Sequence, residues 1–519
     1  MNYLHVELPS LHLVWKRDGQ TDVVCSVIRT NYPKPSLLLV PAIMRTSGVA
    51  EVRVIDMKIR DQDVIVPYCE FNYGEGKMVA SRMGMPFDSI RSQLEWADIL
   101  GLTINPSSWA NLAVDFAGYA KCVNPQIKII IGGTDATFRP EFYLRHEHFE
   151  KRRLFDFVVV GEGEVAGPEL LRRLEFGQQV DEIFGVAYYS DGKVIMNGIN
   201  RNVCLDDEPL PAMDLFVDDM SLWTTPIEGY VGMEVRPPIA PLYITRGCNN
   251  ACEYCTTPQK YGRLRFKSLS RVEEELKHFK TFGIGTINIW DDSLSSLVGR
   301  GERDLLIGYI RLIRQYGFSF EYAQGMVIRD LWNKEKNEPD FALIKELYGH
   351  AIVDGQFVGC YGQYTPFEFL QTENPHDLNS KLIPFDKELR VLQAILDQGV
   401  RYLSYSCILG RADDSAEQFR LAESRMKQIQ GIIEAAGARG LATPYIYSIF
   451  PGTRIWSREI ERLDYSIEEY PELYQLNAAP HGTTHLTPGE LMQAKLDLER
   501  ESLGEERFKC WIKTGRYQW

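Results

Sequence analysis

The chain has 519 residues, 45% of them hydrophobic, with 57 Lys and Arg against 71 Asp and Glu, so its net charge is −14. This length exceeds what one hydrophobic core usually supports, and two or three domains are expected. The acidic balance, with no long basic run, disfavours a nucleic-acid partner. No stretch approaches the roughly 20 apolar residues of a membrane span, and the N-terminus lacks a secretion-signal pattern, so we expect a cytoplasmic protein with no membrane partner.

Residues 1–200 contain five short apolar runs: "SLLLVPAIM", "VRVIDMKI", "ADILGLTI", "IKIIIGG" and "FDFVVVG". Segments of helix length separate them, a pattern that predicts a doubly wound, Rossmann-like parallel sheet. Ligands bind such sheets at the carboxyl ends of the strands, and glycine there lets the backbone approach a ligand closely. The candidate ligand-binding residues at these ends are Asn105, Ser107, Ser108, Gly132, Gly133, Thr134, Gly161 and Glu162.

Residues 201–238 are rich in Pro and acidic residues with little periodicity, which predicts a linker. The next segment, "ITRGCNNACEYCTTP", places Cys248, Cys252 and Cys255 close together, whereas the other seven cysteines are scattered singly. Structural zinc takes four ligands, and a bacterial ferredoxin has a different spacing and a further Cys before Pro. Three thiolates suit a four-iron, four-sulfur cluster with one open iron. Three ordinary cysteines in a loop are the alternative.

The spacing C-x3-C-x-aromatic-C, with Tyr254 before the last Cys, resembles the signature of the radical S-adenosylmethionine (radical SAM) superfamily. The resemblance implies that S-adenosylmethionine chelates the open iron near Tyr254. It also implies that one electron, delivered by a donor such as flavodoxin or ferredoxin, breaks a sulfonium bond. The resulting deoxyadenosyl radical then takes a hydrogen atom from the substrate.

The sequence after the cysteines alternates β-rich runs with helix-compatible segments, which predicts a partial (β/α)6 barrel over residues 239–455. Asp291 and Asp292 follow the strand "TINIW", at the end where such barrels carry their chemistry. The resemblance implies that they bind the amino group of S-adenosylmethionine; a helix-capping or turn role is the alternative. Residues 456–519 are expected to form a helical C-terminal region.

The N-terminal order of motifs resembles the cobalamin-binding domain that precedes the barrel in one large branch of the superfamily. The candidate residues of residues 1–200 would then contact cobalamin or the domain interface. The chain lacks the Asp-x-His-x-x-Gly motif whose imidazole coordinates cobalt in many cobalamin domains. This absence leaves open a domain that binds no corrinoid.

The resemblance implies a cofactor set of a 4Fe-4S cluster, S-adenosylmethionine and possibly cobalamin. With cobalamin, the expected reaction is C-methylation of a peptide or small natural-product intermediate, consuming two S-adenosylmethionine molecules per turn. Without it, the protein is expected to be a peptide epimerase, with Cys360 or Cys407 as hydrogen-atom donor, although buried cysteines are usually only small apolar residues. A corrinoid-binding module without catalysis is the third alternative.

Overall fold

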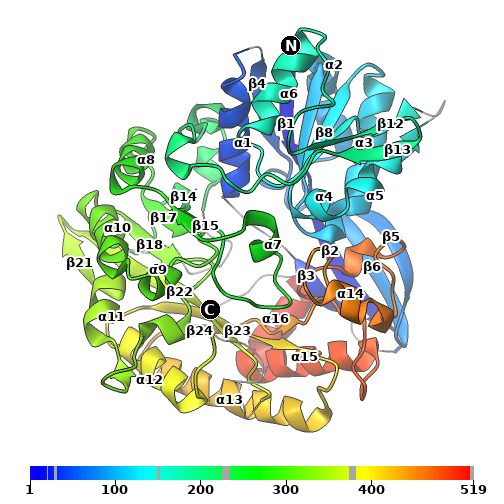
Figure 1. Ribbon diagram of the computed structural model, residues 1–519. Coiled ribbons are helices and arrows are strands. Elements are labelled where there is room, and N and C mark those ends of the chain that lie inside the picture. The colour runs from blue at the N-terminus through cyan, green and yellow to red at the C-terminus, as the bar shows by residue number, and fades with distance from the viewer. Residues whose placement is uncertain are drawn as a thin grey trace.

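The computed structural model describes residues 1–19, 22–27, 32–48, 50–148, 152–224, 234–372 and 381–514. These residues form an N-terminal α/β unit, a larger α/β barrel and an antiparallel sheet covered by the C-terminal helices (Figure 1). The fold is therefore the α/β architecture expected from the sequence, with one further layer. No helix within these ranges has the length and apolar composition needed to cross a membrane.

The N-terminal unit is built on a seven-stranded sheet in which five neighbouring strands run parallel and two follow antiparallel at one edge. In the parallel part the spatial order is β4-β1-β7-β8-β11, so the chain moves from β1 to one side and then returns to the other. Parallel sheets bind ligands at such a reversal of strand order. The strands are β1 (Asn2–Glu7), β4 (Glu51–Asp56), β7 (Ile99–Thr103), β8 (Lys128–Gly132), β11 (Phe157–Val159), β12 (Val186–Ser190) and β13 (Lys193–Met196).

Two elements of this unit differ from the sequence expectation. The run "SLLLVPAIM" lies in a helix, α1 (Pro35–Arg45), which begins with a proline in its first turn and ends with Arg45. A continuous apolar run does not distinguish a strand from a buried helix, and the length of 11 residues decides for the helix. The first strand, β1, lies in the middle of the sheet, although its sequence "NYLHVE" was not among the predicted runs.

The barrel contains six parallel strands in sequential order, which confirms the partial (β/α)6 barrel. Helices cover its outer face, and their apolar residues form the largest core cluster together with the outward-facing strand residues. The strands are β14 (Ile239–Leu242), β17 (Thr286–Ile289), β18 (Ser319–Tyr322), β22 (Gln356–Glu368), β23 (Tyr402–Leu409) and β24 (Arg439–Ala442), and the main helices are α8 (Leu269–Thr281), α10 (Arg303–Gln315), α11 (Phe341–Tyr348), α12 (Phe385–Leu396) and α13 (Ala416–Ala435).

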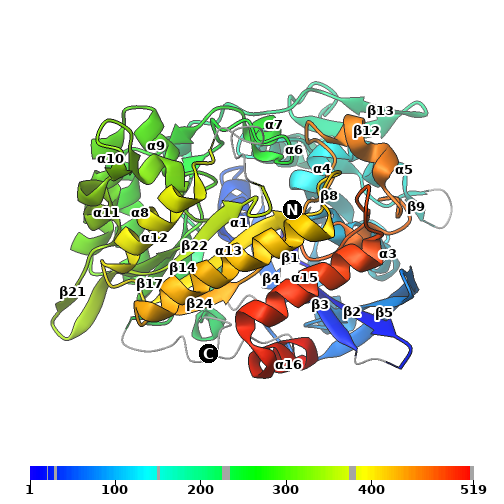
Figure 2. The same cartoon turned by 90° about the horizontal axis from the view of Figure 1, so that it is seen from below.

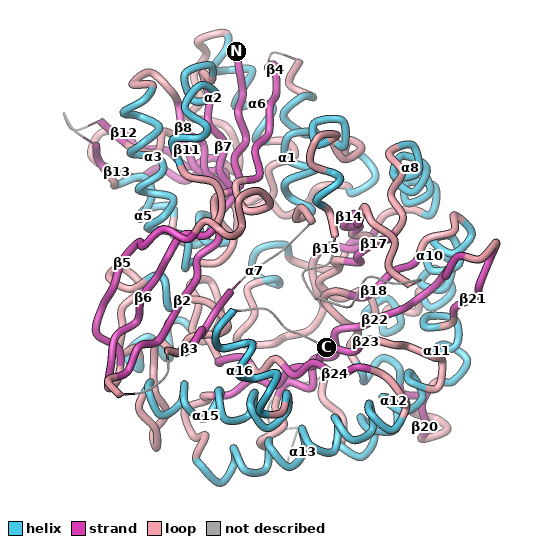
Figure 3. Tube along the Cα trace, turned by 180° about the vertical axis from the view of Figure 1, so that it is seen from behind, coloured by secondary structure: helices cyan, strands magenta, loops and turns pink. Residues whose placement is uncertain are grey.

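The third layer joins the two ends of the chain. Four antiparallel strands inserted into the N-terminal unit form a separate sheet in the order β3-β2-β6-β5. It packs against the C-terminal helices (Figure 3), and α15 also lies along α13 (Figure 2). The elements are β2 (Ser10–Arg17), β3 (Val23–Val27), β5 (Ile65–Tyr73), β6 (Gly76–Met83), α15 (Pro488–Leu503) and α16 (Glu505–Thr514).

Candidate functional site

The three clustered cysteines line one small cavity of about 70 Å³ at the mouth of the barrel. They lie on the loop that follows β14, the first barrel strand. Among the described residues, no three Cys, His, Asp or Glu side chains converge on one point that could hold a single metal ion. Ligands of an iron–sulfur cluster bind separate irons, so convergence on one point is not required of them.

Hydrogen bonds hold this loop in shape. The backbone N–H and the side-chain Nδ2 of Asn250 both lie 3.4 Å from Cys248 Sγ, as donors to the sulfur. Arg329 donates in turn to Asn250 Oδ1 over 3.2 Å. Burial raises the pKa of the Cys255 thiol to about 11, so iron would have to displace a proton there.

Tyr254 packs its ring against two aromatic side chains from neighbouring barrel segments. The ring centroids lie 5.8 Å from Phe369 and 6.0 Å from Tyr447. The Tyr254 hydroxyl also donates a hydrogen bond to Glu368, at the end of β22. This tyrosine therefore ties the cysteine loop to the carboxyl end of the fourth barrel strand.

The two adjacent aspartates have different environments. Asp291 is buried, and its carboxyl oxygens accept hydrogen bonds from the backbone N–H groups of Ile244 and Thr245. Burial raises its pKa to about 7. Asp292 accepts from Gly247 N over 3.2 Å and lines both the cysteine cavity and a second, larger cavity. Asp291 thus positions the start of the cysteine loop, and Asp292 is the one open to ligands.

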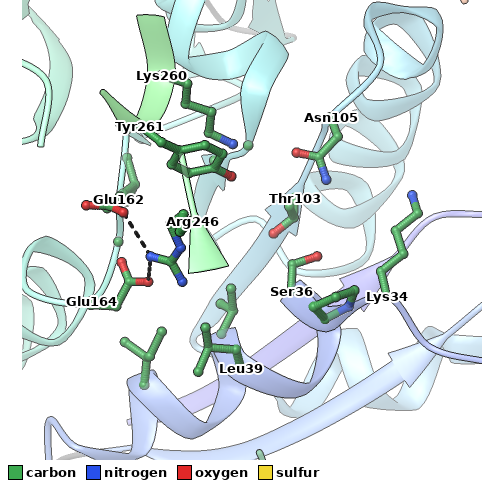
Figure 4. A pocket seen from close by; sticks show the side chains of 18 of the residues that line it. Lys34, Ser36, Leu39, Thr103, Asn105, Glu162, Glu164, Arg246, Lys260 and Tyr261 are labelled. Atoms are coloured by element: carbon green, nitrogen blue, oxygen red, sulfur yellow. Dashed lines mark hydrogen bonds and ion pairs between the residues drawn. The ribbon is translucent and has the colours of Figure 1, made fainter. Parts of the chain in front are cut away.

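The larger cavity, of about 270 Å³, lies between the carboxyl edge of the N-terminal sheet, helix α1 and the barrel (Figure 4). Five of the eight candidate residues at the strand ends line it, and they come from the ends of β7, β8 and β11. They are Asn105, Gly132, Gly133, Gly161 and Glu162.

The other three candidates lie beside the cavity without lining it. Ser107 Oγ donates to Asp135 over 2.5 Å, and Ser108 is buried. Thr134 Oγ1 accepts from Lys260 Nζ over 3.1 Å, a contact between the N-terminal unit and the barrel. The structure therefore gives Ser107 and Thr134 positions in supporting networks.

An ion-pair cluster across the domain interface was not foreseen. Arg246, two residues before Cys248, pairs with Glu162 at 3.0 Å, with Glu164 at 2.5 Å and with Glu208 at 2.5 Å. Figure 4 shows its guanidinium directed at the two glutamates of the N-terminal unit. Only tertiary structure brings these residues together, since Glu164 and Arg246 are 82 positions apart.

The sequence patterns also gave no indication of the cavity wall formed by β1 and α1. Tyr3 and His5 point from β1 over Gly101 of β7, where an added Cβ would come 1.9 Å from the Tyr3 hydroxyl. His5 Nε2 is buried and has no hydrogen-bond partner among the described residues. Burial lowers the pKa of His5 to about 4, so its imidazole is neutral. Lys34, paired with Glu7 at 3.0 Å, lines the same cavity.

No protein-family model matches the chain. The uncharacterized methyltransferase PH0819 of Pyrococcus horikoshii is 27% identical over 368 residues, which cover 70% of this chain and 69% of that protein. The hopanoid C-3 methylase of Methylococcus capsulatus is 30% identical over 199 residues, 38% of this chain and 35% of the methylase.

Two solved structures resemble the whole architecture. OxsB, a cobalamin-dependent S-adenosylmethionine radical enzyme with aqua-cobalamin and S-adenosylmethionine bound, has a TM-score of 0.65 at 15% identity, covering 99% of this chain and 70% of its own. TsrM of Kitasatospora setae, a radical S-adenosylmethionine methyltransferase with a tryptophan substrate and aza-SAM bound, has a TM-score of 0.55 at 11% identity, covering 90% and 77%. This chain has the fold of the cobalamin-dependent radical SAM enzymes.

In a radical SAM fold, a hydrogen donor must face the barrel interior. Cys360 lies on β22 in the core cluster shared with the helices, and its Sγ donates to Gly362 O. Cys407 lies on β23 with its Sγ 3.8 Å from Met426 Sδ on α13. Both thiols are fully buried against the helix layer, and neither lines the two cavities. Both side chains point to the helix-facing side of their strands, and a hydrogen-donor role for either cysteine stays a prediction.

The residues present fit the cofactors of a cobalamin-dependent radical SAM fold. Three cysteine thiols facing one cavity are the donor set that a four-iron cluster with an open iron requires. The larger cavity combines apolar walls, glycines at two strand ends and the unpartnered nitrogen of His5, as a flat ligand with polar edges requires.

Proposed function

We propose that this protein is a cobalamin-dependent radical SAM enzyme that methylates an unactivated carbon of a peptide or small natural product. The observation that carries the proposal is that Asp292 lines both cavities. The cysteine cavity and the cavity at the edge of the Rossmann-like sheet are therefore neighbours. A radical formed at one would arise next to a methyl donor held at the other.

The residues would hold the cofactors as follows. Cys248, Cys252 and Cys255 would bind the cluster, and Asp292 would accept from the amino group of S-adenosylmethionine. The N-terminal cavity would hold part of the corrinoid, since 270 Å³ is less than a whole cobalamin occupies. Cobalamin would supply a transferable methyl group. The residues assigned to its cavity are Asn105, Gly132, Gly133 and Gly161.

The chain itself would orient these groups and exclude water. Arg246 binds carboxylates of the N-terminal unit while its neighbours carry the cysteine loop, so it fixes the distance between the two cavities. Electrons would come from an external low-potential donor such as flavodoxin or ferredoxin. The substrate would enter the barrel mouth beside Asp292.

The first experiment tests the cluster. In anaerobically reconstituted protein with dithionite, Cys252→Ala should lose the broad absorption near 400 nm and all deoxyadenosine formation, because one thiolate anchor is missing. Cys407→Ala is the matched control, since this buried cysteine on β23 packs against α13, outside the cysteine cavity, and should leave both signals intact. Deoxyadenosine formation by Cys252→Ala would overturn the proposal.

The second experiment separates methylation from epimerisation. Protein loaded with cobalamin, given S-adenosylmethionine with a deuterated methyl group and a panel of peptides and tryptophan, should yield products carrying that methyl group by mass spectrometry. S-adenosylhomocysteine and deoxyadenosine should form together. Products in heavy water that gain one deuterium and no methyl would instead establish the epimerase.

A further inference from the structure

One charged pair lies beside the cysteine cavity, with only its lysine in the cavity wall, and the proposed function leaves the role of this pair open. Lys381 lines this cavity beside the three cysteines and is the only cation among the described residues that do so. Its ammonium pairs with the Glu368 carboxylate, and both side chains are largely buried, at 18% and 4% exposure. The pair therefore acts through a medium that screens charge much less than water does.

The backbone directs Glu368 toward Lys381 at a cost. Glu368 has a φ of 55°, in the left-handed region that favours glycine. The register between β22 and β23 shifts at the same place, between Pro366 and Glu368. A bulge re-aims a side chain, and a strained residue persists only where the surrounding structure holds it. The hydrogen bond from Tyr254, within the cysteine motif, completes that hold.

We propose that Lys381 and Glu368 form an electrostatic pair that sets the reduction potential of the cluster bound by the three cysteines. This inference rests on the cluster in the proposed function and is independent of methylation. A four-iron core of charge 2+ bound by three thiolates has a net charge of −1, and it becomes −2 when one electron from an external donor is added. Lys381 stabilises the added negative charge, and Glu368 opposes that effect.

If the pair sets the reduction potential of the cluster, removing its cation and removing its anion should shift that potential in opposite directions. Lys381→Met removes the cation, so at a fixed potential the ratio of reduced to oxidised cluster should fall at least about tenfold, or ~59 mV for one electron. Glu368→Gln keeps an acceptor for Tyr254 but removes the negative charge, so the ratio should rise. Both are measured without S-adenosylmethionine, by titration with dithionite and electron paramagnetic resonance of the reduced cluster.

Two further variants serve as controls. Lys381→Arg keeps the charge and should titrate close to the native protein. Lys121→Met removes a half-buried lysine that pairs with Asp156 in the N-terminal unit, and it should not move the reduction potential. Iron and sulfide content reports separately on cluster assembly, so absence of a cluster in the native protein would count against the proposed function and not against this pair.

The inference would be overturned if the reduction potential shifted with the same sign in Lys381→Met and Glu368→Gln. It would also be overturned if neither shift exceeded that of Lys121→Met. If Lys381→Met fails to assemble a cluster, Glu368→Gln decides alone, because a potential equal to or below the native value contradicts the proposal.

Discussion

Glu321 is a half-buried carboxyl group inside the barrel, and its hydrogen-bond partners among the described residues are neutral. It lies on β18 directly opposite Asn288 of β17, whose Nδ2 donates to Glu321 Oε1 over 2.6 Å. The same Nδ2 donates to the Tyr32 hydroxyl, and Tyr361 also bonds to Glu321. Burial raises the pKa of Glu321 to about 7. Its charge state therefore changes near neutral pH.

This shift predicts a pH dependence of stability. Below pH 4.5 the carboxyl is protonated in both the folded and unfolded chains. As the pH rises to about 7, the unfolded chain releases the proton and the folded chain keeps it, so the free energy of unfolding falls. The variant Glu321→Gln has no such proton to release, so its free energy of unfolding should not fall in this way. Relative to the native protein, its free energy of unfolding should rise by roughly 1–3 kcal/mol between pH 5 and pH 8, as measured by urea unfolding.

The control removes a carboxylate whose pKa is lowered in the folded protein, not raised. Glu346 pairs with Arg311 at the surface, and that hydrogen bond lowers its pKa. Glu346→Gln should show no gain in unfolding free energy at pH 8 relative to pH 5. An equal gain in both variants would mean that Glu321 is not responsible.

At the scale of single residues, local signals were predictable and long-range ones were not. The three clustered cysteines are recognisable because they lie within eight positions of one another, and the structure brings them to one cavity. Glu162 was singled out by its place after a strand, yet its partner Arg246 carries no periodic or compositional signal. The strand face on which Cys360 and Cys407 lie could not be predicted from sequence, because the pleat decides it and register shifts interrupt the pairing of β22 with β18 and with β23.

Among the elements, the turn after β8 depends most on a single residue type. Gly133 has a φ of 104°, and a Cβ there would come 2.3 Å from the carbonyl oxygen of Ile104. Ile104 follows β7, so the glycine lets two adjacent strand ends approach each other. This approach forms part of the wall of the larger cavity.

Gly133→Ala should therefore destabilise the protein. The strained backbone alone costs roughly 1–3 kcal/mol, and the contact with Ile104 adds to it. Gly118→Ala is the matched control, since Gly118 lies inside helix α3 (Ala110–Val123) with open space around its Cα. This substitution should raise the free energy of unfolding by about 0.5–1 kcal/mol. Urea unfolding of both variants measures the difference; a neutral Gly133→Ala would show that the turn tolerates a side chain.

Element prediction succeeded where sequence patterns were unambiguous. Strands β7, β8 and β11 and the barrel strands followed from apolar runs bounded by glycine and polar residues. Helix α1 did not, because an all-apolar run has no period to measure. Strand β1 was not predicted because Tyr3 and His5 weaken its apolar pattern. The two side chains fit in the sheet only because Gly101 of the neighbouring strand has no side chain.

In the whole molecule, the antiparallel sheet and the C-terminal helices share one core. Trp15 of β2 is 2% exposed, packs edge-on against Tyr73 at 5.7 Å and lies in one cluster with Met492 and Leu496 of α15. Trp15→Ala should cost roughly 3–5 kcal/mol of unfolding free energy. Phe176→Ala, at a side chain 65% exposed, should change it by less than about 0.5 kcal/mol. Equal effects in thermal unfolding would contradict this shared core.

The same layer has a consequence for synthesis on the ribosome. Arg17 donates a hydrogen bond to Gln493 over 2.7 Å, across 476 positions of sequence. At typical rates of elongation, about 25 to 100 s separate the emergence of strand β3 from that of Trp511, which completes their common core. During this interval the apolar face of the first hairpin has no native cover. The hairpin of β2 and β3 therefore lacks its native cover until α15 and α16 have been synthesised, and we expect chaperones to bind this hairpin during the interval.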